Sequence, residues 1–422
     1  MDFKKEVKGL FRNTMYLYLV QGLNYILPML VLPYLIKTLS IVSFGIYSFV
    51  FAFSQIVLLF VDFGFNISAT KKIAENHNDN QFVKQIFWNV IFVKSILAII
   101  SLLITLLVVL LASKWAIYTE GILLSFVMIV SNVFFPLWWF QGLNKMKTLS
   151  IINAVSKVFT YPLIFVFVVA ATDHNKAIII QSMSFLIASI LAFVYIRRHY
   201  PYYFRQLELR NRIKYFGSEI KDSYQIFLSN STTTLYTNSL TLILGCFYSS
   251  YHVGLFGAME RIVRVVCFGI LGPINQAVFP FLVQLKTRDF NKANKIFKMV
   301  ILIVLGVLIS GYGLYFVFEN FIHSYFLSNY AQAQELMPYF MLMIFPIALG
   351  GVLGQLGLLA LGKEVEKRAF SKVYIYIGLF SLPFSIFFIR LFAVEGAMFM
   401  MLGVETLIFL AFVLMCRKYK YL

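Results

Sequence analysis

Cysteine and charge are both scarce in this sequence. Of 422 residues only three are cysteines, Cys246, Cys267 and Cys416, and charged residues make up 13% of the chain. The cysteines are far apart and lie in apolar segments, so their spacing favours neither a metal site nor a disulfide framework. The five histidines are scattered as well. The sequence therefore predicts no bound metal and no cofactor.

Long hydrophilic segments are lacking too. The largest one, residues 197–223, carries seven basic residues, and the longest loop predicted on the outer side, residues 319–335, has 17 residues. Neither is long enough to hold an ATP-binding domain or a catalytic domain outside the membrane. These absences argue against an enzyme.

Apolar residues are abundant instead. They make up 60% of the chain, against roughly 45–50% in a typical soluble domain, and they occur in long runs. About 20 apolar residues cross the hydrocarbon layer as a helix, and only helices and closed barrels satisfy their backbone polar groups there. The runs lack the alternating pattern of barrel strands, so the sequence predicts an all-α integral membrane protein.

Twelve transmembrane helices are predicted. When the N-terminus is placed in the cytoplasm, the outer loops hold only four basic residues, Lys37, Lys114, Lys176 and Arg390, out of 36 lysines and arginines. This asymmetry puts both termini in the cytoplasm and explains the net charge of +18 without a nucleic-acid ligand. The predicted spans are 15–36, 44–65, 86–112, 117–140, 151–171, 177–196, 224–247, 253–285, 296–318, 336–361, 373–389 and 397–416.

The two halves of the chain resemble each other weakly. Residues 44–47 (FGIY) match residues 253–256 (VGLF) at an offset of 209, which also carries span one onto span seven. Six spans in each half give a parallel repeat, in which two bundles enclose a cavity. We therefore expect an N-lobe of residues 1–210 and a C-lobe of residues 211–422, joined by a cytoplasmic linker over 197–223.

Span eight holds the most informative charges. Glu260 and Arg264 are four residues apart and can pair on one helix face, with Arg261 beside them. Arg264 shares its face with Asn275 and lies roughly 16 Å deep, near the bilayer midplane. Two arginines for one glutamate leave a surplus positive charge, which favours an anion-binding cavity wall over a structural ion pair.

Two lysines lie inside other spans. Lys94 shares a helix face with Ser101 and Thr105, and Lys157 shares one with Asn153 and Thr160. Each lysine either faces a hydrated cavity or reaches back to the cytoplasmic headgroups. We take both as candidate cations of the substrate cavity.

Polar and acidic side chains complete the candidate site. Hydroxyls and amides on a helix face suit a sugar, although they also bond neighbouring helices in membranes. Buried carboxylates are candidates for binding a coupling ion, H+ or Na+. The polar candidates are Gln21, Tyr25, Asn230, Thr234, Thr237, Thr241 and Asn275, and the acidic candidates are Asp62, Glu260 and Glu405.

Four segments carry a family resemblance. They are residues 62–74 (DFGFNISATKKIA), 136–143 (PLWWFQGL), 253–261 and 275–280 (NQAVFP). In this order and at these spacings they resemble O-antigen repeat-unit flippases of the Wzx type. That family is the polysaccharide transporter branch of the multidrug/oligosaccharidyl-lipid/polysaccharide (MOP) exporter superfamily, and the resemblance covers nearly the whole chain.

The resemblance implies a MATE-like fold in the bacterial inner membrane and a substrate, an undecaprenyl-pyrophosphate-linked oligosaccharide moved to the periplasmic leaflet. It implies alternating access driven by an ion gradient, with membrane lipids and other O-antigen assembly proteins as partners. It places Arg261 and Arg264 at the anionic headgroup, and Lys94 and Lys157 nearer the cytoplasmic entrance. The alternatives are a drug/cation antiporter, whose cavity should favour acidic residues, and a membrane polymerase or ligase of the same glycan pathway.

Overall fold

The structure is a computed structural model, which describes residues 27–204, 212–327, 330 and 332–422. This part of the chain is helical and contains no strand. Eight of its helices are long and apolar enough to cross a membrane, or nine when a bent pair is counted as one span. The expected all-α, multi-pass membrane architecture is therefore confirmed at this level. The full count of twelve spans remains a prediction.

The chain forms two compact units, each described here by itself. Among the described residues, the first comprises residues 27–39 and 50–230, and the second comprises residues 40–49 and 231–422. Relative to the predicted lobes, residues 40–49 pack with the second unit and residues 212–230 with the first. The boundary predicted after residue 210 remains a prediction.

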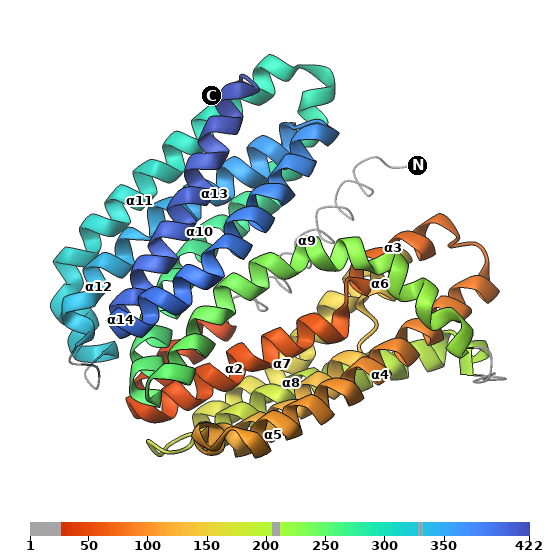
Figure 1. The fold of residues 1–422 in the computed structure, drawn as a ribbon. Coiled ribbons are helices and arrows are strands. Elements are labelled where there is room, and N and C mark those ends of the chain that lie inside the picture. Colours follow the sequence, from red (N-terminus) through yellow and green to blue (C-terminus); the bar gives the residue numbers. More distant parts are fainter. Residues whose placement is uncertain (1–26, 205–211, 328–329, 331) are drawn as a thin grey trace. The chain divides into compact units, whose positions relative to one another are not determined.

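The first unit is a bundle of long apolar helices. Figure 1 shows α4, α5, α7 and α8 running side by side, with α5 packed against α4 and α8. Asp79 begins α4, because its carboxylate accepts hydrogen bonds from the free backbone N–H groups of Gln81 and Phe82. The elements are a helix over Leu27–Thr38, α2 (Ile41–Asp62), α3 (Phe65–Glu75), α4 (Asn80–Leu111), η1 (Ser113–Trp115), α5 (Ala116–Val133), α6 (Leu137–Gly142), α7 (Met146–Phe167), α8 (His174–His199), η2 (Pro201–Phe204) and α9 (Arg212–Phe247).

The first part of α9 is tied to α3 by polar contacts. Lys72 Nζ lies 2.9 Å from Glu219 Oε2, and the hydroxyls of Ser68 and Ser223 are 2.6 Å apart. These contacts explain why the residues before 231 belong to the first unit.

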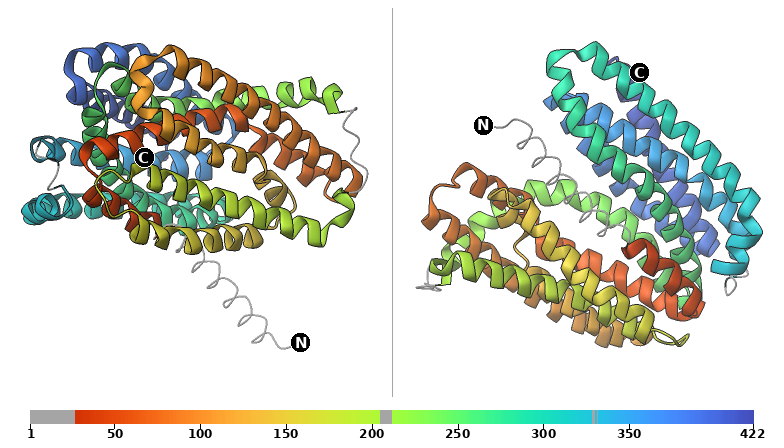
Figure 2. Two further views of the ribbon diagram at one scale, coloured as in Figure 1. Left: turned by 90° about the horizontal axis from the view of Figure 1, so that it is seen from below. Right: turned by 180° about the vertical axis from the view of Figure 1, so that it is seen from behind.

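The second unit is built around α10. Helices α11, α13 and η3 pack against α10, and α13 and η3 also pack against α14, as the views in Figure 2 allow the reader to follow. The elements are the end of α9, α10 (Ser250–Arg288), α11 (Phe290–Phe326), α12 (Ala333–Leu342), α13 (Ile344–Val352), the π-helical η3 (Leu353–Leu361) and α14 (Glu364–Lys418).

Two predicted spans are interrupted or bent, and one kink separates two predicted spans. The span expected over 117–140 is two helices, because α5 ends at Val133 and Pro136 has no N–H with which to continue it. Helix α10 bends by 41° between Gly272 and Ala277. Helix α14 contains two helices joined at Ala393, whose φ of 47° leaves the helical region, so the predicted spans 373–389 and 397–416 lie on either side of this kink.

The two repeat glycines lie against each other within the second unit. A Cβ atom on Gly45 would collide with the carbonyl oxygen of Ser250, and one on Gly254 would collide with that of Ile41. Ile41 and Ser250 are related by the same offset of 209 as the two glycines. Each contact therefore has its counterpart, which is the pattern that a twofold axis between two equivalent segments requires.

We expect Gly45→Ala to destabilise the protein, because the added methyl group meets backbone atoms that have no room to move. Overpacking of this kind costs about 1–3 kcal/mol, and thermal unfolding of the purified protein in detergent measures it. Gly306→Ala on α11 is the matched control, since its Cβ would meet nothing within 4 Å among the described residues. Equal unfolding midpoints for the two variants would contradict the close crossing.

Candidate functional site

The ion pair predicted within α10 is present. Arg264 Nε lies 2.7 Å from Glu260 Oε1, one helical turn away. An arginine carries five N–H donors, and this contact uses one of them. Within the described part of the chain, the four donors at the end of the Arg264 guanidinium have no hydrogen-bond acceptor, and the side chain is 20% exposed. A free guanidinium end of this kind can bind an anionic group with two hydrogen bonds.

A second carboxylate belongs to the same cluster. Glu405, on the second half of α14, is 7% exposed and accepts a 3.2 Å hydrogen bond from the Tyr236 hydroxyl of α9. Arg264 and Glu260 lie within electrostatic range of it. Sequence analysis predicted no partner for Glu405, so its place in this cluster is new.

Arg261 rests on aromatic rings. Its guanidinium carbon lies 4.7 Å from the centre of the Tyr47 ring and 5.5 Å from that of Phe44, both near the start of α2. This is the geometry of a cation–π contact. With Glu405 counted, two arginines accompany two carboxylates, so the surplus positive charge expected for this region is present only while Glu405 holds a proton. The preference for an anion now depends on the free donors of Arg264.

The polar stripe on α9 is largely bonded within its own helix. Thr241 is buried, whereas Thr234 and Thr237 are half-buried. The Asn238 amide donates to the Thr234 carbonyl at 2.9 Å and to the Thr237 hydroxyl at 3.3 Å. Lining of a cavity by this stripe stays a prediction. Gln21 and Tyr25 lie outside the described residues, as does the side chain of Asn230.

Asn275 sits in the bend of α10, eleven residues beyond Arg264 and on the same helix face. Its side-chain oxygen is buried and has no hydrogen-bond partner in the described part of the chain. A buried amide oxygen without a donor is destabilising, so this position favours occupation by water or by a donor group of a ligand.

In the first unit, Lys94 forms a closed ion pair. Its Nζ atom lies 2.7 Å from Asp62 Oδ1 at the end of α2, and it donates to both oxygens of Asn132 at the end of α5, at 2.7 and 3.0 Å. The Lys94 side chain is 1% exposed, and Trp138 covers it with its ring centre 4.9 Å away. All three ammonium donors are used, so the lysine neither reaches the headgroups nor offers a donor to a substrate. Asp62, 25% exposed, is engaged by this lysine.

The two family segments of the first half meet around that ion pair. After Asp62 the backbone turns through Phe63 and Gly64, both with positive φ, of 40° and 79°. Helix α3 then packs on α6, where a Cβ atom on Gly142 would collide with the side chain of Ile73. These segments therefore build the scaffold that encloses Lys94.

Lys157 is the fourth predicted cation. It is half-buried on α7, beside Thr160, which is buried and donates to the backbone oxygen of Ser156. Lys94 and Lys157 belong to the first unit, whereas Arg261 and Arg264 belong to the second. The two lysines and the two arginines are therefore described in separate units, and a cavity role for Lys157 remains a prediction.

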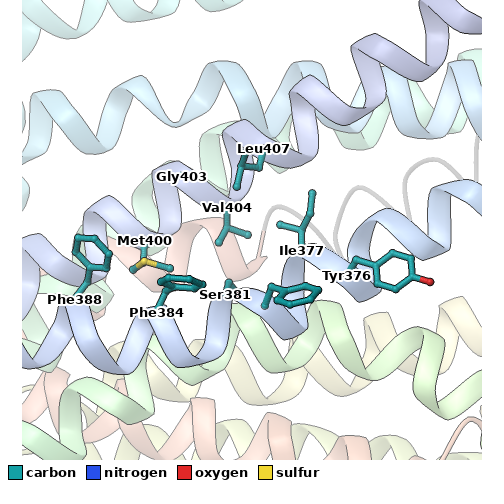
Figure 3. A pocket seen from close by; sticks show the side chains of 10 residues that line it. Tyr376, Ile377, Ser381, Phe384, Phe388, Met400, Gly403, Val404 and Leu407 are labelled. Carbon is teal, nitrogen blue, oxygen red and sulfur yellow. The ribbon is translucent and has the colours of Figure 1, made fainter.

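The groove drawn in Figure 3 is apolar. It has a volume of about 350 Å³ and is formed by the two halves of α14, with Phe384, Phe388 and Met400 among its walls. Ser381 in its wall donates to the carbonyl of Gly378. No charged residue lines it, so it is not an anion site. Within the described part of the chain, no group of His, Cys, Asp and Glu gathers as a metal site.

Reasoning from sequence missed three residues that complete these clusters: Tyr236, Asn132 and Trp138. Each partners a charge on another helix, and the Tyr236–Glu405 contact joins residues 169 positions apart. An amide or phenol inside an apolar span was the available signal, since such groups require a partner in lipid.

The comparisons with known proteins agree with this architecture. The family model described as "Polysaccharide biosynthesis protein" matches residues 10–286. An Escherichia coli (strain K12) protein named "Putative O-antigen transporter" is 37% identical over 273 residues, which are 64% of this chain and 64% of that relative's length. A protein of the same name from Shigella dysenteriae is 28% identical over 399 residues, covering 94% of this chain and 98% of that one.

Two solved structures share the fold. An inward-facing multidrug-resistance MATE family transporter of the MOP superfamily matches with a TM-score of 0.66 and 14% identity, over 94% of each chain. The lipid II flippase MurJ in an inward closed conformation matches with a TM-score of 0.70 and 12% identity, over 96% of this chain and 87% of that one. At these identities the matches establish the fold alone.

We expect Lys94→Met to destabilise the first unit, because it leaves the Asp62 carboxylate and the Asn132 amide oxygen without their donor. Breaking a buried pair costs about 3–5 kcal/mol, and the partial exposure of Asp62 favours the lower end of that range. Thermal unfolding in detergent measures the loss.

Lys71→Met is the matched control for this variant. Lys71 pairs with Glu75 on the surface of α3 and is 75% exposed, so its removal should change little. A Lys94→Met protein as stable as the control would contradict the closed pair, whereas a partial recovery in the double variant Lys94→Met/Asp62→Leu would support it.

Proposed function

Because this chain belongs to the polysaccharide biosynthesis protein family, we propose that it is a flippase for undecaprenyl-pyrophosphate-linked O-antigen or polysaccharide repeat units. The membership confirms the resemblance predicted from the sequence. The curated relatives are named as O-antigen transporters, and MurJ, which shares the fold, is named as a lipid II flippase. These names support a transporter over an enzyme.

The proposal rests on the end of the Arg264 guanidinium, whose four N–H donors have no acceptor among the described residues. A pyrophosphate loses its hydration when it enters a membrane, and a guanidinium restores part of that stabilisation through paired hydrogen bonds. Arg264 offers four such donors beyond its bond to Glu260. Arg261 would add positive charge nearby, and Asn275 would offer its amide to the sugars. Lys94 would act as a scaffold residue, and Lys157 would lie nearer the cytoplasmic entrance.

The proposed architecture has twelve spans in the bacterial inner membrane, with both termini in the cytoplasm. The kink at Ala393 supports this count, since it keeps the predicted spans 373–389 and 397–416 distinct. The proposed movement is alternating access between the lobes 1–210 and 211–422, driven by an ion gradient. The polyprenyl tail would stay in the lipid while the headgroup crosses through the protein.

A drug/cation antiporter is the second candidate, favoured by one observation. Glu405 is a buried carboxylate, the kind of group that binds a cationic drug or a coupling cation. Drug-susceptibility profiles of a deletion strain distinguish the candidates: new sensitivities with intact surface glycan would support the antiporter. A membrane polymerase or ligase would instead extend glycans in a purified system, which we do not expect.

We expect Arg264→Ala to abolish surface O-antigen while the protein level in the membrane stays unchanged, because the headgroup loses its charged donors. Arg264→Lys should retain part of the activity, since an ammonium keeps the charge but not the paired geometry. Surface glycan is measured in a strain that lacks its own copy, and flipping of labelled lipid-linked glycan is measured in proteoliposomes. Arg390→Ala, at an exposed arginine of the same unit, is the control. Normal surface glycan in Arg264→Ala would overturn the role of Arg264.

A further inference from the structure

The guanidinium of Arg264, in the second unit, interacts with two carboxylates. Arg264 is in contact with Glu260, and Glu405 lies within electrostatic range of both. Among the described residues, the other titratable groups that interact with Glu405 include Tyr236 on α9, Tyr374 on the first half of α14 and Cys267 on α10, which are neutral in their ordinary state. Helices α13 and η3, which also pack on α14, carry no titratable side chain.

Glu405 shares the positive charge of Arg264 with Glu260, so an ionised Glu405 is only partly compensated. Glu260 and Arg264 neutralise each other as a hydrogen-bonded pair. An ionised Glu405 would then be a second negative charge at a position that is 7% exposed, where an uncompensated charge is costly. Its Oε1 accepts from Tyr236, and its Oε2 has no hydrogen-bond partner among the described residues. That oxygen has room for a proton.

We infer that Glu405 is a proton-binding site whose occupancy is linked to the anion held by Arg264, an inference that rests on the proposed function. An anion at the free end of Arg264 adds negative charge to the cluster. It also interacts with the positive charge of Arg264 that otherwise stabilises an ionised Glu405. A proton from the surrounding water then binds a carboxylate oxygen of Glu405, forming one O–H bond, and it returns to water when the anion leaves. The coupling is reciprocal, so a protonated Glu405 strengthens anion binding by the same factor, on the order of tenfold.

The test measures the binding of inorganic pyrophosphate to the full-length protein in detergent, as a function of pH. The slope of log affinity against pH counts the protons taken up on binding. Protonation of pyrophosphate itself contributes equally in every variant, so it cancels in the comparison. We expect the slope of Glu405→Gln to differ from that of the unmodified protein by up to about one proton.

Two further variants keep the result interpretable. Glu395→Gln removes an exposed carboxylate from the same helix and should leave the slope unchanged. Tyr236→Phe removes a hydrogen bond to the ionised carboxylate, so the linkage should persist but move to higher pH. The comparison is limited to variants whose midpoint of thermal unfolding equals that of the unmodified protein.

The outcomes separate this inference from the proposed function. If Glu405→Gln binds pyrophosphate with the same pH slope as the unmodified protein, the proton site is wrong and the anion site stands. If Arg264→Ala binds pyrophosphate as tightly as the unmodified protein, or neither protein binds it, the anion site fails and the linkage fails with it.

Discussion

A charge inside an apolar helix bundle has to be compensated by the protein, because lipid tails carry no hydrogen-bonding or charged group. Two clusters in this chain meet that constraint in opposite ways. Lys94 has three donors, and Asp62 and Asn132 accept all of them. Arg264 has five donors, and Glu260 accepts one. The lysine is therefore committed to holding helices together, whereas the arginine keeps most of its binding capacity for a group that the described residues do not supply.

This difference gives the two units different parts in the proposed function. Around Lys94 the turn after Asp62 and the helix pair α3–α6 form a scaffold in which Trp138 covers the buried ammonium group. Around Arg264 the neighbours are a carboxylate that can change its charge, Glu405, and a buried amide oxygen without a donor, Asn275. A site for a hydrated anionic headgroup needs groups of the second kind, whose hydrogen bonds are still available.

The sequence predicted what depends on composition and on neighbours along one helix. Long apolar runs identified the helices, and the four-residue spacing identified the Glu260–Arg264 pair. It could not predict contacts between helices, and so Glu405 had no partner and Lys94 was assigned to the cavity. The charge count depended on such a contact, since the charge of one buried carboxylate distant in sequence decides whether the surplus is present. The break in the span predicted over 117–140 was missed for a local reason. Hydropathy alone joins the apolar residues on either side of Pro136 into one run, although Pro136 interrupts the helix.

The glycine crossing and the charged face of α10 are parts of one surface. Gly254 and Arg261 are seven residues apart, which places them on the same face of the helix. At Gly254, the start of α2 approaches α10 closely enough for backbone contact. Two turns further along α10, Arg261 lies over the rings of Tyr47 and Phe44 of that same segment. A larger residue at the crossing would lift α2 away and remove the aromatic rings that now cover this guanidinium. The close approach of two backbones thus fixes the environment of a charge two turns further along, and the start of α2 cannot move without changing it.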